Sequence, residues 1–363
     1  MFLQRLYVKD FRSFSECTVD FIDGVNIIVG DNGQGKTSLL EALFFCITAT
    51  SFRTPHVKEL IRFSQKGLFV EARFQKQGVN HVLTIAYDGQ KRRVSFNHAP
   101  CQNATELLGM IPGVACTPED IELVQGAPSD RRRFLDLMLA QQDHHYVHHL
   151  RRYNRALKQR NVLLKQKKPA SLFCWEAELA QSGAYLAKQR MLAIVTISER
   201  AKSTCQALIG QDIAFEIGYD SFSKGLDTLD AMQKHLEHEF VKKREQEMDY
   251  GMTLTGPHRD DLDIRFQKKS AKDFASIGQK RLIGHSLRLA EWYFLKERCE
   301  EEPLMIVDDF ATSLDSTKTG RLAQELGKLG QVFLTSTDMP ESKIDKPINR
   351  ILLNHQESCV QMA

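Results

Sequence analysis

The sequence predicts an α/β fold in which a mixed sheet with an antiparallel flank is interrupted by an inserted α-helical arm. Three observations support this prediction. A glycine-rich motif lies between an apolar strand and a helix, the apolar period changes from 2 to 3.6 near Ser129, and strand patterning returns after Pro257. We therefore expect residues 1–125 and 251–363 to form the two halves of one lobe, with residues 126–250 as the arm.

The composition is that of an ordinary water-soluble protein. Of the 363 residues, 42% are hydrophobic and 26% are charged, with a formal net charge of +3. No apolar run approaches the ~18 residues that a membrane helix needs, so we do not expect a membrane protein. The eight cysteines occur singly, without a C-x-x-C pair, which predicts free thiols in a cytoplasmic protein.

Alternating apolar residues predict β-structure in the first segment. The pattern covers residues 3–8 and 19–22. A hairpin is expected between residues 81–87 and 91–97, because Asp88-Gly89-Gln90 is a short turn sequence between two β-rich runs. The N-terminal half of the lobe should therefore carry an antiparallel flank.

Residues 30–37 fit the G-x-x-x-x-G-K-[ST] phosphate-loop pattern, between the apolar strand 25–29 and a helix that follows. Such a loop binds a nucleoside triphosphate, because its glycines let backbone N–H groups turn toward phosphate oxygens. Lys36 adds a positive charge, and Thr37 adds a ligand for Mg²⁺. The expected nucleotide-binding residues are Gly30, Asp31, Asn32, Gly33, Gln34, Gly35, Lys36, Thr37 and Ser38.

Two long helices are expected in the arm. An apolar stripe of period 3.6 runs from Ser129 to Leu164 and stops at Lys168-Pro169, and a second runs from about Ser171 to Leu208. Each helix would have about 35 residues and span ~50 Å at 1.5 Å per residue. Because only a short turn joins them, the two helices should pair antiparallel.

The first of these helices carries a cluster of positive charges. Residues 151–168 contain eight Lys and Arg residues and no acidic residue. A solvated helix face is the ordinary interpretation of a charge run, but this face lacks i,i+4 acidic partners and repels itself. We therefore expect it to contact DNA phosphates, without base recognition. The candidate residues are Arg151, Arg152, Arg155, Lys158 and Arg160.

Four histidines precede this cluster. His144 and His148, and His145 and His149, form two i,i+4 pairs, a spacing that can hold a metal ion on a helix. No third ligand or carboxylate pattern accompanies them. We therefore interpret them as ordinary helix residues.

A second half-site is expected near the C-terminus. Residues 304–307 are apolar and end in Asp308 and Asp309, the Walker B pattern. Any buried strand can end in an aspartate, but together with the phosphate loop the pattern is specific. Asp308 would hold Mg²⁺ with Thr37, and Asp309 would face the γ-phosphate and its attacking water.

Further polar segments flank Walker B. Ser276 and Gly278 open a helix, either as an ordinary cap or as an anion site. Their order between the phosphate loop and Walker B is typical of an ATP-binding-cassette (ABC) head, in which this signature completes the site of a second subunit. Residues 312–315 would then face the dimer, and residues 335–338 would sense the γ-phosphate, although such clusters are usually turns or caps.

The chain resembles the RecF family, bacterial DNA-repair ATPases related to the heads of Rad50 and SMC proteins. The resemblance covers essentially the whole chain. It rests on Phe11-Arg12-Ser13-Phe14, residues 30–42, 51–54, Pro118-Glu119-Asp120 with 131–136, Thr255 to Leu262, and the signature and Walker B segments. One departure is Ser313-Leu314-Asp315, where the family usually carries Glu-Leu-Asp. His258 and Arg259 could contact phosphate or brace a turn, and we favour the brace.

The resemblance implies a function for these motifs. ATP and Mg²⁺ would drive two heads into a homodimer with Lys36, Asp308, Asp309, Ser276 and Gly278 as its catalytic residues. The dimer would bind duplex DNA near single-strand gaps, and slow, DNA-stimulated ATP hydrolysis would release it. RecO and RecR would be partners in loading the RecA recombinase, in the cytoplasm at the nucleoid.

Three other functions share the phosphate loop. The ATPase subunit of a membrane transporter has the same cassette, but the long arm and its uncompensated positive charges argue against it. A Rad50-type DNA tether needs a far longer coiled coil than this arm. A nucleotide kinase is disfavoured because its Walker B strand would follow the phosphate loop much sooner.

Overall fold

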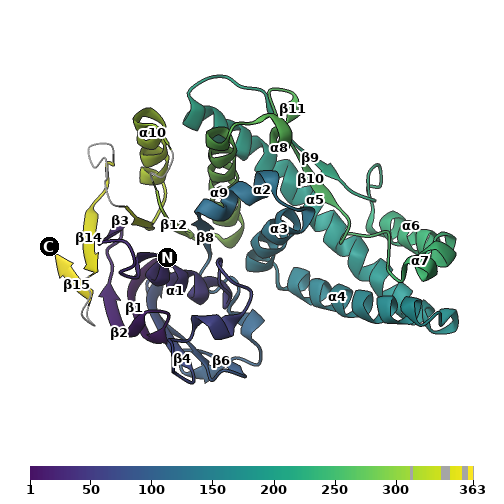
Figure 1. Cartoon of the computed structure of the whole chain (residues 1–363), viewed down its shortest axis with the longest axis horizontal. Helices are drawn as coiled ribbons and strands as arrows, with labels where there is room; N and C mark the ends of the chain where they lie inside the picture. Colours follow the sequence, from purple (N-terminus) through teal and green to yellow (C-terminus); the bar gives the residue numbers. More distant parts are fainter. Residues whose placement is uncertain (311–313, 337–343, 354–358, 363) are drawn as a thin grey trace. The chain divides into compact units, whose positions relative to one another are not determined.

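A computed structural model describes residues 1–310, 314–336 and 344–353 of the chain, and the backbone of residues 359–362. The chain folds into two compact units (Figure 1). The head unit comprises Met1–Ile121, Ser203–Gln211 and Ile277–Ala363, and the arm unit comprises Glu122–Lys202 and Asp212–Ser276. The arm unit thus begins close to the predicted residue 126 but extends beyond the predicted residue 250.

The antiparallel flank of the head forms one sheet in the order β2-β1-β4-β5-β6-β7. The predicted hairpin is confirmed as β5 and β6, because the Asp88 side chain accepts hydrogen bonds from the backbone N–H groups of Gln90 and Lys91 at 3.0 and 2.7 Å and so closes the turn. The strands are β1 (Phe2–Phe11), β2 (Phe14–Asp20), β4 (Leu68–Lys76), β5 (Val79–Tyr87), β6 (Arg92–Phe96) and β7 (Ala99–Pro100).

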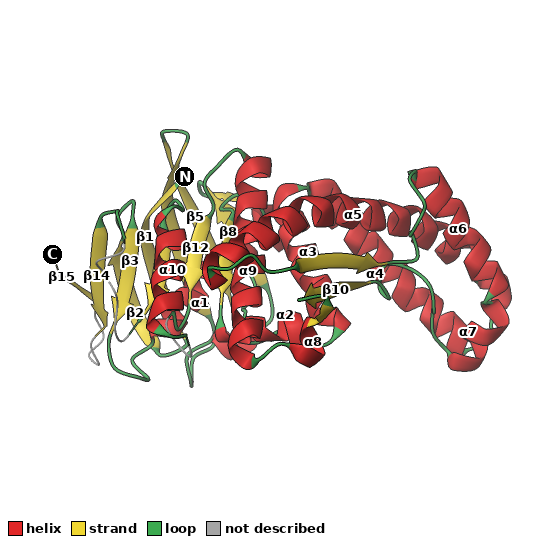
Figure 2. Ribbon diagram, turned by 90° about the horizontal axis from the view of Figure 1, so that it is seen from above, coloured by secondary structure: helices red, strands yellow, loops and turns green. Residues whose placement is uncertain are grey.

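A second sheet of the head brings the phosphate-loop and Walker B strands together, as Figure 2 shows. Its order is β15-β14-β3-β13-β12-β8, and all neighbours are parallel except β14 and β15. Because parallel strands end at the same edge, the residues that follow β3, β13, β12 and β8 lie close together. The strands are β3 (Val25–Val29), β8 (Gly113–Cys116), β12 (Leu304–Val307), β13 (Val332–Thr335), β14 (Ile348–Leu353) and β15 (Cys359–Met362).

Helices α1 and α9 contribute much of the apolar core of the head. Leu39, Leu40 and Leu43 of α1 are fully buried, and so is Trp292 of α9, whose Nε1 donates to the carbonyl oxygen of Pro303 at 2.7 Å. A buried indole N–H that finds such a partner costs little. The helices are α1 (Lys36–Thr48), α9 (Ile277–Cys299) and α10 (Ser316–Gly327), with short 3₁₀ turns η1 (Val57–Leu60), η2 (Ala104–Leu107) and η3 (Pro118–Ile121).

The arm unit combines helices with a small antiparallel sheet in the order β11-β10-β9. The last residues of α5, from Ser203, belong to the head unit. The helices are α2 (Glu122–Gln125), α3 (Pro128–Gln142), α4 (His144–Lys165), η4 (Pro169–Ser171), α5 (Phe173–Ile209), α6 (Leu229–Lys242), α7 (Arg244–Tyr250) and α8 (Ala271–Phe274). The strands are β9 (Phe215–Asp220), β10 (Asp261–Phe266) and β11 (Lys269–Ser270).

The prediction of one continuous helix from Ser129 to Leu164 is wrong. The backbone leaves the helical region at Asp143, with φ −139° and ψ 105°, so α3 and α4 are separate helices. Asp143 caps α4, because its Oδ1 accepts from the backbone N–H of His145 at 2.8 Å. The apolar stripe continues across the break, which is why the period alone did not reveal it.

The predicted antiparallel pairing of the two long arm helices is confirmed for α4 and α5. Contacts along α4 meet α5 in reverse order. Arg160 pairs with Glu176, Arg152 pairs with Glu178, and Asp143 accepts from the Tyr185 hydroxyl. The second predicted helix corresponds to α5, which has 37 residues.

The cysteine prediction needs one correction. Cys17 on β2 is disulfide-bonded and is therefore not a free thiol. The spacing of cysteines along the sequence could not reveal this, because a disulfide depends on which residues the tertiary fold brings together. Among the described residues, the free thiols are Cys46, Cys101, Cys116, Cys174, Cys205 and Cys299. Separately, the helices of the described part of the chain contain no stretch long and apolar enough to cross a membrane.

Candidate nucleotide-binding site

The phosphate loop connects the carboxyl end of β3 to the start of α1. Its glycines take backbone conformations that side chains disfavour, with φ of 155° at Gly30, 85° at Gly33 and 97° at Gly35. At Gly35 a Cβ would also lie 2.9 Å from the Phe14 ring and from Ser13 Oγ. Gly35 is the N-cap of α1 and has no side chain to cap it, so the first N–H groups of the helix remain suited to phosphate oxygens.

The side chains of the loop hold it in shape. Lys36 Nζ donates to the carbonyl oxygens of Gly30 and Asp31 at 2.6 and 3.0 Å, so its ammonium lies over the loop. Gln34 Oε1 accepts from the backbone N–H of Asp31 at 2.7 Å, while Asn32 is exposed. The whole predicted segment from Gly30 to Ser38 therefore lies in the loop and the first turn of α1.

The structure brings the two predicted magnesium ligands together. Thr37 Oγ1 donates to Asp308 Oδ1 at 3.1 Å, although the residues are 271 positions apart in the sequence. Asp308 follows β12 and is 6% exposed. A hydroxyl and a carboxylate oxygen are hard ligands of the kind that Mg²⁺ prefers, so this pair fits a magnesium ion bound with a triphosphate.

A third residue, Thr335 at the end of β13, completes this group. Its Oγ1 donates to Asp308 Oδ1 at 2.8 Å and accepts from the backbone N–H of Asp309 at 2.9 Å. Because β13 lies between β3 and β12, Thr335 stands between the phosphate loop and Walker B. The sequence pointed to residues 335–338 as a γ-phosphate sensor and did not foresee this contact.

Electrostatics at Asp308 favour binding of a cation. Burial raises the pKa of its carboxyl, and the negative charges of Asp309 and Glu119 act in the same direction. The hydrogen bonds from Thr335 and Thr37 lower that pKa. A divalent cation would favour the ionised carboxylate in the same way, since it supplies positive charge to a partly desolvated group.

The second Walker B carboxylate faces outward. Asp309 is exposed and has a φ of 53°, a conformation that its N–H bond to Thr335 helps to hold. Its carboxylate therefore lies in solvent beside the buried Asp308. This is the placement expected for a group that orients a water molecule.

The signature turn lies on the surface. Ser276 is exposed and immediately precedes α9, and Ile277 is 65% exposed. Among the described residues, nothing lies within 4 Å of the position that a Cβ on Gly278 would take. The start of α9 is thus accessible to another molecule.

The structure describes the predicted polar segments 312–315 and 335–338 only in part. Thr312, Ser313, Thr337 and Asp338 lie outside the described residues. Asp315, which we expected in a dimer-facing loop, caps α10 by accepting from the backbone N–H of Lys318 at 2.9 Å.

An ion pair between Arg12 and the buried Glu41 of α1 was not assigned from the sequence. Arg12 donates to both carboxylate oxygens of Glu41 at 2.7 and 2.8 Å, and the Ser51 hydroxyl also bonds that carboxylate. Glu41 is fully buried on α1, one helical turn after Thr37. Arg12 and Ser51 both lie in segments on which the family resemblance rests. Those segments were the signal in the sequence that could have identified the residues that hold α1 in place.

The positive residues of α4 do not form one uniform stripe. Arg151, Arg155 and Lys158 are exposed on one face, whereas Arg152 pairs with Glu178 of α5. The prediction that Arg160 contacts DNA is wrong, because its side chain is fully buried. It is seven residues after buried Tyr153 and four before buried Leu164, so it points to the same interior face.

The buried Arg160 is held by neighbours of opposite charge. Its guanidinium forms ion pairs with Glu176 and Glu247 at 2.9 and 2.6 Å and donates to Thr253 Oγ1 at 2.9 Å. It also lies over the Phe240 ring, 4.7 Å from the centroid. These contacts compensate the desolvation of the charge.

The contacts of His258 and Arg259 fit the bracing interpretation. His258 Nε2 donates to the Thr253 carbonyl oxygen at 3.1 Å, so its Nδ1 accepts from the Tyr153 hydroxyl at 2.5 Å. Arg259 donates to the same carbonyl oxygen at 3.0 Å. Burial lowers the pKa of His258 to about 4, which keeps the ring neutral.

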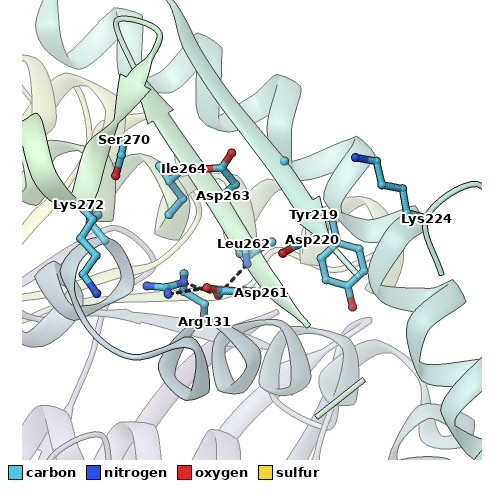
Figure 3. A pocket seen from close by; sticks show the side chains of 12 residues that line it. Arg131, Tyr219, Asp220, Lys224, Asp261, Leu262, Asp263, Ile264, Ser270 and Lys272 are labelled. Atoms are coloured by element: carbon cyan, nitrogen blue, oxygen red, sulfur yellow. Dashed lines mark hydrogen bonds and ion pairs between the residues drawn. The ribbon is translucent and has the colours of Figure 1, made fainter. Parts of the chain in front are cut away.

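A hollow of about 480 Å³ lies in the arm unit beside the sheet of β9 and β10. Figure 3 shows the side chains that line it. At its centre Arg131 forms a two-pronged ion pair with Asp261 at 2.7 and 2.8 Å. Because these opposite charges satisfy each other, we assign no ligand to the hollow. The described residues also contain no group of three or more His, Cys, Asp and Glu side chains that could hold a metal ion.

Comparison with known proteins places these features in context. A family model described as the RecF/RecN/SMC N terminal domain matches residues 2–358. The DNA replication and repair protein RecF of Protochlamydia amoebophila is 41% identical over 339 residues, covering 93% of this chain and 94% of that protein. The protein of the same name from Chlamydia caviae is 34% identical over 341 residues, covering 94% and 93%.

Solved structures show the same fold. The recombination mediator protein RecF with ATP, from the RecFOR pathway, superposes with a TM-score of 0.91 at 26% identity, covering 100% of this chain and 98% of that one. An Smc head bound to the C-winged helix domain of ScpA gives 0.58 at 15% identity, covering 100% and 98%, which supports the fold alone. The predicted α/β head with an inserted helical arm is thereby confirmed.

Proposed function

The chain belongs to the RecF family, and on that premise we propose that it is an ATP-dependent DNA-binding protein of recombinational repair and replication-fork maintenance. The observation that carries the proposal is the hydrogen bond between Thr37 and Asp308, which joins the phosphate loop to Walker B beside the open start of α1. The RecF relatives support this proposal by their role in DNA replication and repair.

In this proposal different residues of the site bind the phosphates, bind Mg²⁺ and orient the attacking water. The backbone of residues 30–38 and the Lys36 ammonium hold the phosphates, and Thr37 and Asp308 hold Mg²⁺. The bound magnesium supplies charge neutralisation to the phosphates. Asp309 orients the attacking water, and the reaction is a weak, DNA-stimulated ATPase that resets the protein slowly.

ATP acts as a switch between monomer and homodimer. Ser276 and Gly278 of one copy complete the nucleotide site of the other, so the γ-phosphate makes contacts in the dimer that ADP cannot make. The exposure of Ser276 and the open space at Gly278 support this arrangement.

DNA contact is assigned to the exposed face of α4. Arg151, Arg155 and Lys158 lie on it, whereas the charge of Arg152 is shared with Glu178. Contact with phosphates alone makes the binding insensitive to base sequence, and the preferred substrate is duplex DNA at a junction with a single strand. RecO and RecR are the proposed partners, and the solved RecF relative, which is described as part of the RecFOR pathway, supports their involvement. We assign to them the common task of helping to load RecA.

One experiment tests the switch. The affinity for gapped duplex DNA is measured with a non-hydrolysable ATP analogue, with ADP and without nucleotide, while light scattering reports the mass of the protein. We expect dimers and tighter DNA binding only with the analogue and Mg²⁺. Lys36→Met serves as the control that responds to no nucleotide. Equal DNA affinity in all three states would overturn the proposal.

A further inference from the structure

The arm unit carries an exposed aromatic side chain at the end of its positively charged face. We propose that Tyr250 stacks on an unpaired base of DNA whose phosphates are held by α4. This inference rests on the proposed function and deepens it, since it names the part of a DNA junction that the arm recognises.

The exposed positive residues in the second half of α4 lie on one side of the helix and lead toward α7. Arg155, Lys158, Val162 and Lys165 follow one another at spacings of three or four residues, so they share one side of the helix, and all four are exposed. From Arg155 to Lys165 the helix rises about 15 Å at 1.5 Å per residue. That length corresponds to about four nucleotides of a stacked strand.

Tyr250 lies directly beside the end of this stripe. Gly251 ends α7 with a φ of 66°, and a Cβ there would lie 2.8 Å from Lys165 Cγ. The two flanking side chains are open to solvent, Tyr250 at 62% and Met252 at 41%. Figures 1 and 2 both show α7 next to the C-terminal end of α4.

The backbone that presents Tyr250 is fixed. The backbone N–H of Thr253 donates to Asn161 Oδ1 of α4 at 2.8 Å. On the other side, Glu247 of α7 pairs with buried Arg160 and accepts from the backbone N–H of Leu254 at 2.7 Å. An exposed ring on a fixed backbone loses little conformational freedom when it binds.

The charges around the ring favour a polyanion. Arg259 lies next to Met252, with its Nη2 3.2 Å from the Met252 sulfur, and adds a cation to those of α4. The exposed acids of α7 are Asp249, next to Tyr250 in the sequence, and Glu245 in the first turn. Cations that follow a backbone, together with an aromatic platform, are the combination that binds single-stranded nucleic acid. In an intact duplex the base faces are already stacked, so the ring gains a partner only where bases are unpaired.

The test compares three DNAs of equal length: an intact duplex, a gapped duplex and a single strand. Binding is measured by fluorescence anisotropy with the ATP analogue and Mg²⁺, for the wild type, Tyr250→Ala and Tyr250→Phe. We expect Tyr250→Ala to bind the gapped duplex and the single strand about fivefold more weakly or worse, with the intact duplex unchanged. Tyr250→Phe keeps the ring and should bind like the wild type.

A direct readout of stacking and a matched control complete the experiment. A 2-aminopurine at the unpaired position should be quenched by the wild type and by Tyr250→Phe, but not by Tyr250→Ala. Val195→Ala removes another exposed apolar side chain, on α5, and should change nothing. Unchanged binding of all three DNAs by Tyr250→Ala, or an equal loss on the intact duplex, would overturn the inference. If the wild type bound no DNA at all, the proposed function itself would fail instead.

Discussion

Thr335 donates a hydrogen bond to the carboxylate of Asp308, and the same hydroxyl accepts from the backbone N–H of Asp309. One side chain on the strand between the phosphate loop and Walker B thus fixes both Walker B residues. Since Asp308 also accepts from Thr37, the carboxylate is oriented by hydroxyl groups from two other elements. This arrangement preorganises the carboxylate for a metal ion.

Thr335→Val should weaken binding of Mg²⁺-ATP. The substitution keeps the shape of the side chain, but it removes a hydrogen bond that lowers the pKa of Asp308 and leaves the Asp309 N–H without its acceptor. We also expect a loss of about 1–2 kcal/mol in the free energy of unfolding. Nucleotide titration with and without Mg²⁺, and urea denaturation, measure the two effects. Thr335→Ser retains the hydroxyl and should behave like the wild type. If Thr335→Val bound Mg²⁺-ATP as tightly as the wild type, the role assigned to Thr335 would be contradicted.

Ser276→Arg should separate nucleotide binding from dimerisation. Ser276 is exposed, so a larger side chain does not enter the core and the variant should still fold. A long cationic side chain at the start of α9 would block the approach of a second copy. We expect normal ATP binding by the monomer and no ATP-dependent dimer in light scattering. Dimers of normal mass from this variant would refute the assignment of Ser276 to the partner's site.

The double substitution Arg155→Ala and Lys158→Ala should make DNA binding weaker and less dependent on salt. Each phosphate contact that is lost should reduce the slope of log affinity against log salt by about 0.9 on duplex DNA. Anisotropy titrations between low and moderate salt give this slope. Lys234→Ala removes an exposed positive charge of α6 and serves as the control. A slope unchanged from the wild type would exclude α4 from the DNA contact.

Arg160→Met should destabilise the arm unit. The substitution leaves Glu176 and Glu247 buried beside an apolar side chain, and the loss of one partner from a buried ion pair costs about 3–5 kcal/mol. Chemical denaturation followed by circular dichroism measures this loss. Arg155→Met, on the exposed face of the same helix, should change the stability by no more than about 0.5 kcal/mol. Similar stability of the two variants would show that Arg160 is not buried as described.

Stability should fall as the pH is lowered from about 6.5 to about 4, in part because of His258. Its pKa is lowered from 6.5 to about 4 by burial, so in this window the unfolded chain binds a proton that the folded chain does not. The loss amounts to at most about 3 kcal/mol and is complete near pH 4. His258→Gln keeps a donor for Thr253 and should flatten the curve of unfolding free energy against pH. His144→Gln, at an exposed position, is the control. If the unfolding free energy of His258→Gln fell with pH as steeply as that of His144→Gln, the prediction would be contradicted.

The sequence alone determined the local structure of the two candidate nucleotide half-sites. The phosphate loop is a contiguous run whose glycines and flanking strand and helix dictate a local geometry, so Gly30 to Ser38 could be assigned without tertiary information. The apolar run before Asp308 likewise identified a buried strand that ends in a carboxylate. The hairpin around Asp88 followed from turn chemistry. In each case neighbours in the chain decide the structure.

Only the tertiary structure decided how distant residues meet. Whether Arg160 is exposed or buried depends on the acids that face it from α5 and α7, and no charge count along α4 contains that information. The role of Thr335 depends on the order of strands in a parallel sheet, which places β13 between β3 and β12. The physical reason is common to both: local pattern sets the conformation of a segment, whereas burial and pairing of polar groups depend on what the rest of the chain packs against them.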